Sequence, residues 1–408
     1  MVAERRVGLG TNQEAVRRHN LGTVLRYVHG AGHMSRAELT TLMGLNRSTI
    51  ADLVGELESL GVVEQAVPAT TRSGAGRPSA QVRLAEVGPY VVAVDLGVDR
   101  ASVARVALGG EIVERATVAI PTRGEAWQVG ASVAALIRGV VDGAPAAAPL
   151  IGVGISIPGL VRRGDGLVRL APNLGWQDVS FGAIVLAALG VDIPVEVGND
   201  ADLGALAEHR RGVGVGIDDL IYISGNVGVG AGIIAGGVRL DGAGGYAGEV
   251  GHLPFALEGR TCHCGNRGCW ETEVGAHAIA TAISCPVDKV AQLGEVLEGY
   301  GEAPPGLAAI GTALGSGLAS IVNAFNPQLV VLGGYFRSLY TLVPTEVGAG
   351  LAARALPAPF ESVTLSLPGL GRDSTLLGAA EIALEPLFMD PVAALGTALL
   401  DVRTHLAG

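Results

Sequence analysis

The stretch GEVGHLPFALEGRTCHCGNRGCWE, residues 248–271, contains three cysteines and two histidines in a segment rich in glycine. Its cysteines form a C-x-C-x4-C pattern, and a histidine lies ten residues before the first of them. Three thiolates and an imidazole make a closed tetrahedral site for a soft divalent ion, whereas a catalytic site keeps one ligand position open. The spacing therefore predicts a structural Zn²⁺ site with the ligands His252, Cys262, Cys264 and Cys269.

Two alternatives bear on this ligand set. His263 lies between two of the cysteines and is a rival fourth ligand, but adjacent residues on an extended C-x-C segment point apart, which favours His252. A disulfide with one free thiol is disfavoured because a reducing compartment keeps thiols reduced. The fourth cysteine, Cys285, is expected to be a small buried hydrophobic residue.

Glu249 and His252 form E-x-x-H, which on a helix would suggest a carboxylate–histidine metal pair. Two glycines and a proline in the same stretch argue against a helix, so the motif is expected on a loop. A loop fixed by a metal can orient Glu249 and Glu271 with little freedom, as a sugar or polyol site requires. Glu258 is expected to be an exposed carboxylate.

Length and composition predict a multidomain globular protein that stays in the cytoplasm. The chain has 408 residues, of which 49% are hydrophobic and 16% charged. The beginning, MVAERRVGLG, does not resemble a signal peptide. The uncharged run 303–336 contains prolines and amides that are costly in lipid, so no membrane association is expected.

Charge divides the chain unevenly. Residues 1–83 carry ten arginines against seven acidic residues, a net charge of about +3. Because the whole chain has a net charge of −11, the remaining residues carry about −14. The first fifth of the chain alone is suited to an anionic polymer.

Residues 1–84 have the spacing of a winged helix-turn-helix DNA-binding domain. A first helix carries an apolar stripe from Leu21 to Val28 and ends at 30–32. Ser35 and Glu38 form a capping box that begins a second helix, and a third helix follows the turn 44–46 and runs to Gly61. The segment SGAGRPSAQVRL is interpreted as part of a two-stranded wing.

The third helix opens with short polar side chains and one guanidinium, a composition suited to base edges in the major groove. Arginines near the tip of the wing would reach phosphate or the minor groove. A three-helix adaptor or dimerisation module is the alternative to DNA binding. The expected DNA contacts are Arg36, Asn46, Arg47, Ser48, Thr49, Arg72 and Arg77.

From Val91 onward, strands alternate with helices in two α/β halves, which predicts a cleft between two lobes. The expected elements include the strands 91–96 and 150–157, a helix at 181–189, and a strand at 193–198 that leads into a helix from Ala201. VGNDADLGA places Asn199 and Asp200 where that strand meets the helix. Asp200 is either a helix cap or a general base for a substrate hydroxyl, and the pattern leaves both open.

The stretch GEVGH…CHCGNRGCWE resembles the signature of the ROK family (repressors, open reading frames and sugar kinases). Further landmarks match in order: IPGLV, APNLGW, VGNDA, ALGSGLASIVNAFNPQLVVLGG and LLGAA. The resemblance covers about residues 20–385, and an N-terminal winged helix is a feature of ROK repressors that ROK kinases lack. It implies that residues 85–408 form an actin-like, ribonuclease-H-like pair of α/β lobes with a sugar in the cleft.

Carried over position by position, the resemblance implies the sugar contacts Asn173, Asn199, Asp200, Glu249, His252 and Glu271. Asp200 takes the place of the catalytic base if the chain is a kinase. His252 would serve both the metal and the sugar, because one ring nitrogen binds the ion and the other donates to a hydroxyl.

ROK kinases also have two phosphate loops, typically D-x-G-G-T-K and G-T-G-x-G-G-G. Here the first reads DLGVDR (95–100), with Val98, Asp99 and Arg100 in place of Gly, Thr and Lys. The second reads SGNVGVGAG (224–232), with Val227 and Ala231 at the changed positions. Both changes argue against tight ATP binding.

The sequence therefore predicts a sugar-responsive transcriptional repressor of carbohydrate genes rather than an enzyme. The expected partners are operator DNA, a monosaccharide effector and a second copy of the chain, as a homodimer or dimer of dimers. An active or bifunctional sugar kinase that uses Asp200 is the first alternative. A scaffold for another protein, such as a sugar-transport component, is the second.

Overall fold

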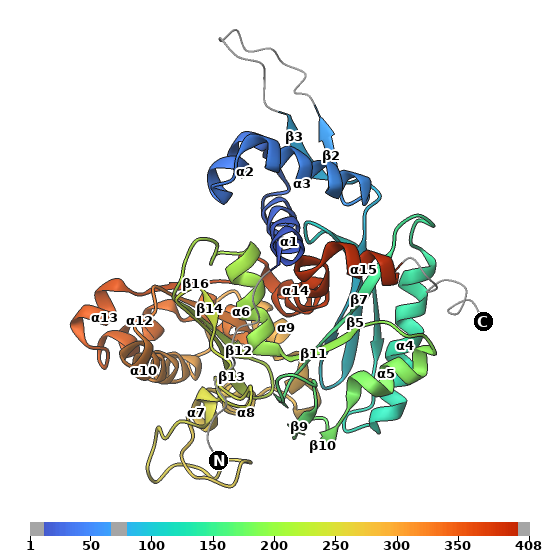
Figure 1. Ribbon diagram of the computed structural model, residues 1–408. Coiled ribbons are helices and arrows are strands. Elements are labelled where there is room, and N and C mark those ends of the chain that lie inside the picture. Colours follow the sequence, from blue (N-terminus) through green and yellow to red (C-terminus); the bar gives the residue numbers. More distant parts are fainter. Residues whose placement is uncertain (1–11, 67–79, 399–408) are drawn as a thin grey trace, which may run out of the picture.

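The computed structural model describes residues 12–66 and 80–398 and shows a small head on a two-lobed body (Figure 1). The head, residues 12–84, has three helices and a sheet of strand order β1-β3-β2. Its elements are α1 (Gln13–Ala31), β1 (His33–Ser35), α2 (Arg36–Met43), α3 (Arg47–Ser59), β2 (Val63–Ala66) and β3 (Gln81–Leu84). Antiparallel pairing of β2 with β3 agrees with the predicted winged helix-turn-helix.

Local sequence explains where the helices of the head begin. The Ser35 hydroxyl accepts a hydrogen bond from the backbone of Glu38, and the Glu38 carboxylate accepts from the backbone of Ser35 at 2.7 Å, which completes the predicted capping box. In α3 the polar residues 46–48 are exposed, and the predicted apolar face from Ile50 to Leu57 is buried.

The first lobe is built on a five-stranded sheet of order β11-β7-β4-β5-β6. Helices α4 and α5 cover one face of this sheet, and α14 covers the other. A small sheet of β8, β9 and β10 lies beside it. The bounds are β4 (Tyr90–Leu96), β5 (Arg100–Ala107), β6 (Ile112–Ala119), α4 (Ala126–Asp142), β7 (Leu150–Ile157), β8 (Leu160–Val161), β9 (Val168–Ala171), β10 (Trp176–Val179), α5 (Phe181–Leu189), β11 (Val195–Asn199) and α14 (Ser374–Met389).

The second lobe repeats the plan with a sheet of order β14-β13-β12-β15-β16. Helix α6 packs on one face of this sheet and also contacts α14, so it lies between the lobes. The strands are β12 (Leu220–Gly225), β13 (Val229–Ala235), β14 (Val238–Arg239), β15 (Leu329–Gly334) and β16 (Thr364–Ser366). The helices are α6 (Asp200–Arg211), η1 (Val250–His252), α7 (Trp270–Val274), α8 (Ala276–Ala282), η2 (Val287–Gln292), α9 (Leu293–Glu298), α10 (Leu307–Phe325), α11 (Tyr335–Leu342), α12 (Pro344–Ala352), α13 (Pro357–Ser362) and η3 (Gly371–Asp373). The last helix, α15 (Pro391–Ala398), follows α14 and packs against α14, β7 and α1.

Helix α10 is, within the described ranges, the one helix long and apolar enough to cross a membrane. It belongs to the core of the second lobe, where it packs against α7 and α12. The Trp270 indole donates to the carbonyl of Ala313 on α10 at 3.1 Å. The apolar character of this helix is therefore accounted for by burial inside the protein.

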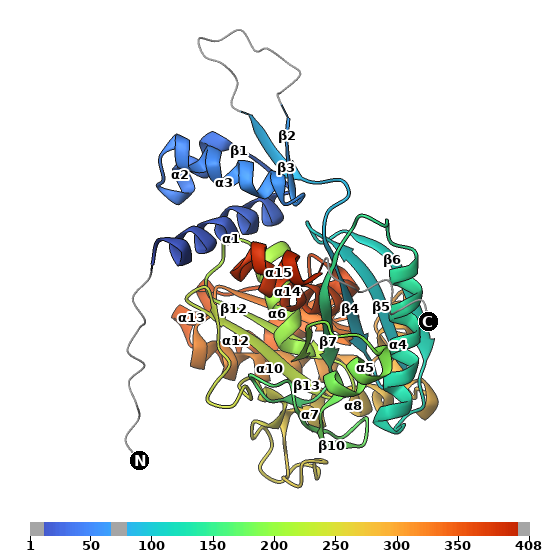
Figure 2. The ribbon, with the colours of Figure 1, turned by 45° about the vertical axis from the view of Figure 1, so that its right-hand side comes forward.

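The head and the body share one hydrophobic core. The buried face of α1, including Leu21 and Leu25, joins the same cluster as Leu384 and Phe388 of α14. Helix α1 lies across α14 and α15 in both ribbon views (Figures 1 and 2). The closest approach is at Gly22, where an added Cβ would lie 1.8 Å from the carbonyl oxygen of Phe388.

We predict that Gly22→Ala loosens the junction between head and body, because the new methyl group overlaps backbone that no side-chain rotation can clear. Overpacking of this kind costs about 1–3 kcal/mol in the free energy of unfolding. Calorimetry should show a lower Tm, and limited proteolysis should release the head faster. Gly30→Ala in the same helix is the matched control, because nothing lies within 4 Å of its Cβ position. Equal effects of the two substitutions would contradict the close packing at Gly22.

Candidate functional site

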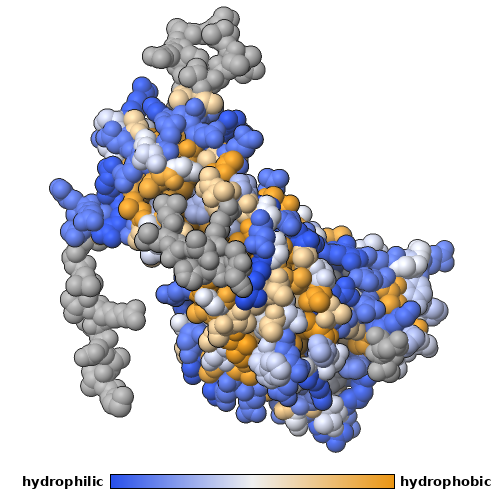
Figure 3. All heavy atoms as spheres, turned by 90° about the vertical axis from the view of Figure 1, so that its right-hand side faces the viewer, coloured by the Kyte–Doolittle hydropathy of each residue, from blue (hydrophilic) through white to orange (hydrophobic). Residues whose placement is uncertain are grey.

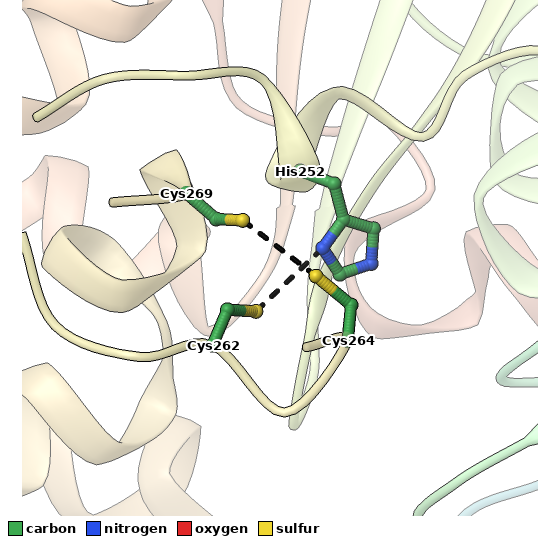
Figure 4. A group of neighbouring side chains, drawn as sticks. All are labelled: His252, Cys262, Cys264 and Cys269. Carbon is green, nitrogen blue, oxygen red and sulfur yellow. Dashed lines mark hydrogen bonds between the residues drawn. The ribbon is translucent and has the colours of Figure 1, made fainter. Parts of the chain in front are cut away.

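Four side chains of the loop 248–271 point toward one another (Figure 4). His252 Nδ1 lies 3.7 Å from Cys262 Sγ, and Cys264 Sγ lies 3.7 Å from Cys269 Sγ. All four ligand atoms lie within 4.8 Å of one another. Zinc bonds of about 2.3 Å to sulfur and about 2.0 Å to nitrogen give tetrahedral edges of roughly 3.5–3.8 Å. These four residues, called the Cys3His cluster below, could therefore hold a divalent metal.

The alternatives to this ligand set are placed differently. His263 Nδ1 lies 3.1 Å from a carboxylate oxygen of Glu271 and 3.9 Å from Cys262 Sγ. Together with His252 and Glu271 it makes a second possible metal group that overlaps the first. All four cysteines are free thiols. Cys285, expected to be a small buried hydrophobic residue, packs against the second-lobe core but is only partly buried.

The loop is anchored to the second lobe at both ends of the cluster. Glu249 precedes η1, a single 3-10 turn that ends at His252, so E-x-x-H lies in a turn of the loop rather than on an α-helix, as predicted. The backbone of Trp270 donates to Leu253 at 3.0 Å, and the Trp270 side chain is buried against α10. The segment between these anchors holds the cysteines.

The same loop carries two carboxylates next to the metal ligands, and neither lines the cavity between the lobes. Glu271 is nearly buried, and one of its oxygens accepts from the backbone of Val229 at 2.8 Å. Glu249 lies 3.9 Å from His252 Nε2, the ring nitrogen that faces away from the cysteines. Burial, followed by the charges of Asp200 and Glu271, raises the pKa of Glu249 to about 7.

Asp200 is the first residue of α6 and is buried. Its Oδ2 accepts a 2.5 Å hydrogen bond from Asn226 Nδ2, and Ser224 donates to the same oxygen at 3.4 Å. Burial, opposed by Asn226 and reinforced by Asp95, raises the pKa of Asp200 to about 6.

Asn199 is the N-cap residue of α6. Its side-chain oxygen accepts from the backbone of Ala201 and Asp202 at 2.9 and 3.1 Å, and its amide donates to Gly159 at 2.9 Å. Asp200 Oδ1 also accepts from the backbone of Ala201 at 2.9 Å, so Asp200 shares in the capping while it lines the cavity between the lobes. Asn173, the remaining expected sugar contact, lies half-buried in the turn between β9 and β10.

A cavity of about 260 Å³ lies between the lobes and is lined by Asp95, Asp200 and Asn226. On its far side, Arg100 donates to Glu295 at 3.2 Å, and Gln292 donates to Asp99 at 3.2 Å. These two contacts join the β4–β5 turn of the first lobe to η2 and α9 of the second.

Sequence reasoning did not assign Asn226 or Asp202 to the site. Asn226 lies within SGNVGVGAG, a glycine-rich turn that marks a close approach of backbone, and this was the available signal. Asp202 lies one turn into α6, nearly buried, with one carboxylate oxygen that has no partner among the described residues. Burial, opposed by Arg239, raises the pKa of Asp202 to about 7.

In the head, Arg47 is the exposed first residue of α3. The Asn46 side-chain oxygen accepts from the backbone of Thr49 and from the Ser48 hydroxyl, so this part of the expected reading surface also caps the helix. Arg36 donates to Gln65 of β2. Hydrophilic residues predominate on the face of the head shown in Figure 3. Arg72 and Arg77 lie outside the described residues.

Comparison with known proteins gives consistent results. The model of the ROK family matches residues 91–385. The chain is 29% identical to a putative xylose repressor of Caldicellulosiruptor sp. (strain Rt8B.4), over 93% of this chain and 99% of the relative. It is also 29% identical to a glucokinase of Halalkalibacterium halodurans, over 71% of this chain and 93% of the relative.

Among solved structures, a ROK family transcriptional regulator that is a homologue of the E. coli Mlc protein shares the fold. Its TM-score is 0.74 at 24% identity, over 97% of this chain and 100% of that chain. The match covers 97% of this chain, so the few residues outside it cannot include the whole head. The likeness therefore extends to the head.

We predict that Asp200→Asn changes how stability depends on pH. The folded protein favours the protonated Asp200 carboxyl, so this contribution to stability is complete below the ordinary value of 3.8 and is lost as pH rises through about 6. Relative to the variant, the wild type should lose roughly 2–3 kcal/mol of unfolding free energy between about pH 4 and pH 7. Urea denaturation across this range measures the difference. Asp192→Asn, at an exposed position, should follow the wild type. Parallel curves for wild type and Asp200→Asn would contradict the assignment.

Proposed function

Because the chain belongs to the ROK family, and because its likeness to a xylose repressor extends through the head, we propose that it is a sugar-responsive transcriptional repressor. The observation that carries this function is the combination of a winged head with a ROK body in one chain. The repressor relative matches 93% of the chain, which must include most of the head, whereas the glucokinase relative matches 71%.

In this proposal, residues 1–84 read operator DNA and residues 85–408 sense the sugar. Arg47 at the exposed start of α3 reaches base edges, and Arg72 and Arg77 of the wing reach phosphates or the minor groove. A cytoplasmic homodimer or dimer of dimers presents paired heads, so the operator is roughly palindromic with half-sites separated by whole helical turns.

The sugar occupies the part of the cleft where the carboxylates of α6 and of the metal loop converge. Carboxylates and amides at this place accept and donate hydrogen bonds to several hydroxyls at once. D-Xylose is the first candidate because the repressor relative is named for it. The proposed contacts are Asn173, Asn199, Asp200, Glu249, His252 and Glu271.

Structural Zn²⁺ in the Cys3His cluster fixes the position of this loop. The separations of the ligand atoms fit a tetrahedral ion, and three thiolates with one imidazole leave no open position for catalysis. His252 uses Nδ1 for the ion, which leaves Nε2, near Glu249, to donate to a hydroxyl.

The body acts as a sensor and not as a kinase. At the first phosphate-loop position, Asp99 places a carboxylate where a triphosphate would bind, and its contact with Gln292 closes that side of the cleft. One observation favours the kinase alternative: Asp200 is buried, faces the cleft and has a pKa of about 6, as a general base would. Sugar-dependent ATP consumption by the purified protein, with formation of ADP and a sugar phosphate, would support that alternative.

Fluorescence anisotropy on the DNA upstream of the protein's own gene, at fixed salt, tests the proposal with D-xylose first and other monosaccharides after it. We expect specific binding that one sugar shifts by about 5- to 150-fold. Arg47→Ala should weaken operator binding by about 1–3 kcal/mol and leave sugar affinity unchanged. Glu249→Gln should retain operator binding and lose the response. Specific binding that no sugar shifts would refute sugar sensing.

We predict that Cys269→Ser loses the metal while Cys285→Ser retains it. Both replace one thiol with a hydroxyl, but only Cys269 belongs to the Cys3His cluster. Native mass spectrometry should find one zinc per chain in the wild type and in Cys285→Ser, and none in Cys269→Ser. Because the loop then loses its anchor, sugar affinity should fall by about tenfold or more. Full zinc content in Cys269→Ser would remove this residue from the ligand set.

A further inference from the structure

One helix connects the cleft to the junction with the head. Helix α6 begins at Asp200, which faces the cleft, and ends at Arg210 and Arg211. It has 12 residues, a rise of about 18 Å at 1.5 Å per residue. Its two ends therefore lie in two separate regions of the molecule.

The far end of α6 binds a buried carboxylate on α14. Arg211 donates through Nε to Glu381 Oε1, and Arg210 donates to Glu381 Oε2 at 3.1 Å. The Glu381 side chain is only 2% exposed. Two guanidinium groups thus compensate one carboxylate that has almost no access to water.

The head provides the remaining partner of this carboxylate. His29 of α1, also buried, lies with Nε2 3.0 Å from Glu381 Oε1. The backbone of Gly109 donates to His29 Nδ1 at 3.0 Å, and His29 Nε2 contacts the Arg211 guanidinium as well as Glu381. Glu381 is therefore the point at which α1, α6 and α14 meet.

Close backbone packing keeps these helices from moving independently. A Cβ at Gly378 of α14 would lie 2.0 Å from the carbonyl oxygen of Leu203 in α6. Glu208 of α6 accepts at 2.7 Å from the Ser374 hydroxyl at the start of α14. A displacement of α6 must therefore carry α14 with it, and α14 bears the head.

We infer that Glu381 is a positioning residue that couples occupancy of the cleft to the placement of the DNA-binding head, through α6 on one side and His29 of α1 on the other. The inference rests on the proposed function, since it names the route of that regulation. A ligand that contacts Asp200 favours one position of α6, and the Glu381 contacts pass that preference to α1.

The test is a comparison of coupling, the ratio of operator Kd with and without sugar, in the full-length protein. The probes are D-xylose and D-glucose, and calorimetry measures sugar affinity separately. In Glu381→Gln we expect the coupling ratio to fall at least about threefold, since the packing at Gly378 and the Glu385 contacts remain, with sugar affinity within about twofold of the wild type. Arg210→Gln keeps the buried Arg211–Glu381 contact, folds more readily, and should lower the ratio at least about threefold.

Arg18→Gln is the matched control. It removes the ion pair between Arg18 and Asp390, which are 2.9 Å apart. This ion pair also joins α1 to the end of α14, but it does not involve α6. Its coupling ratio should equal that of the wild type. Wild-type coupling in both the Glu381 and Arg210 variants would overturn the route while leaving the proposed function intact. Operator binding by the wild type that D-xylose, D-glucose and the other monosaccharides all leave unchanged would refute the proposed function, and the route with it.

Discussion

The packing of α6 between the two lobes is the constraint on which the rest of the structure depends. Its backbone approaches β13 and α14 so closely that a Cβ at Gly232 would lie 2.3 Å from the carbonyl of Ala201, and one at Gly378 would lie 2.0 Å from that of Leu203. Contacts between backbones at these distances leave no side chain whose rotation could absorb a shift. The position of α6 therefore determines where the Asp200 carboxylate lies in the cleft, and equally where α14 and the head lie above it.

The charges at the two ends of this helix are placed in opposite ways. At its start, the helix dipole favours a carboxylate, yet burial and the neighbouring Asp95 raise the pKa of Asp200. The ionised Asp200 carboxylate therefore has a free-energy cost in the cleft, which a hydrogen bond from a ligand hydroxyl would offset. At its end, the dipole favours Arg210 and Arg211, which pair with Glu381 and Glu385, and the pKa of Glu381 is held well below the usual range despite burial. The carboxylate at the first end is held by the neutral donors Asn226 and Ser224, whereas the carboxylate at the other end is paired with two cations. The ligand-dependent end is thus the one that faces the cleft.

Local sequence predicted the parts of the fold that local interactions specify. Hydrophobic periodicity located α3 and the strand 150–157, and the Ser35 and Glu38 pair marked the start of α2. The C-x-C-x4-C spacing brought the metal ligands together because the loop that contains them is short. The strand β6 was not predicted, although its burial alternates residue by residue, as expected at the edge of a sheet. The contact between His29 and Glu381 joins residues 352 positions apart, and no periodicity relates them. Such contacts depend on topology, and so only the folded chain revealed them.

The contacts across the cleft and those at the head differ in how easily they can be broken. Arg100 and Glu295 are each about half exposed, and ion pairs of that kind contribute about 0–1 kcal/mol. Glu381 and His29 are at most 4% exposed, and separating them leaves a buried polar group without its partner, which costs about 1–3 kcal/mol. The lobes can therefore part on the side of the β4–β5 turn more readily than the head can leave α14. In the proposed mechanism, a sugar in the cleft rotates one lobe against the other, and the head moves with the helices that hold it instead of detaching from them.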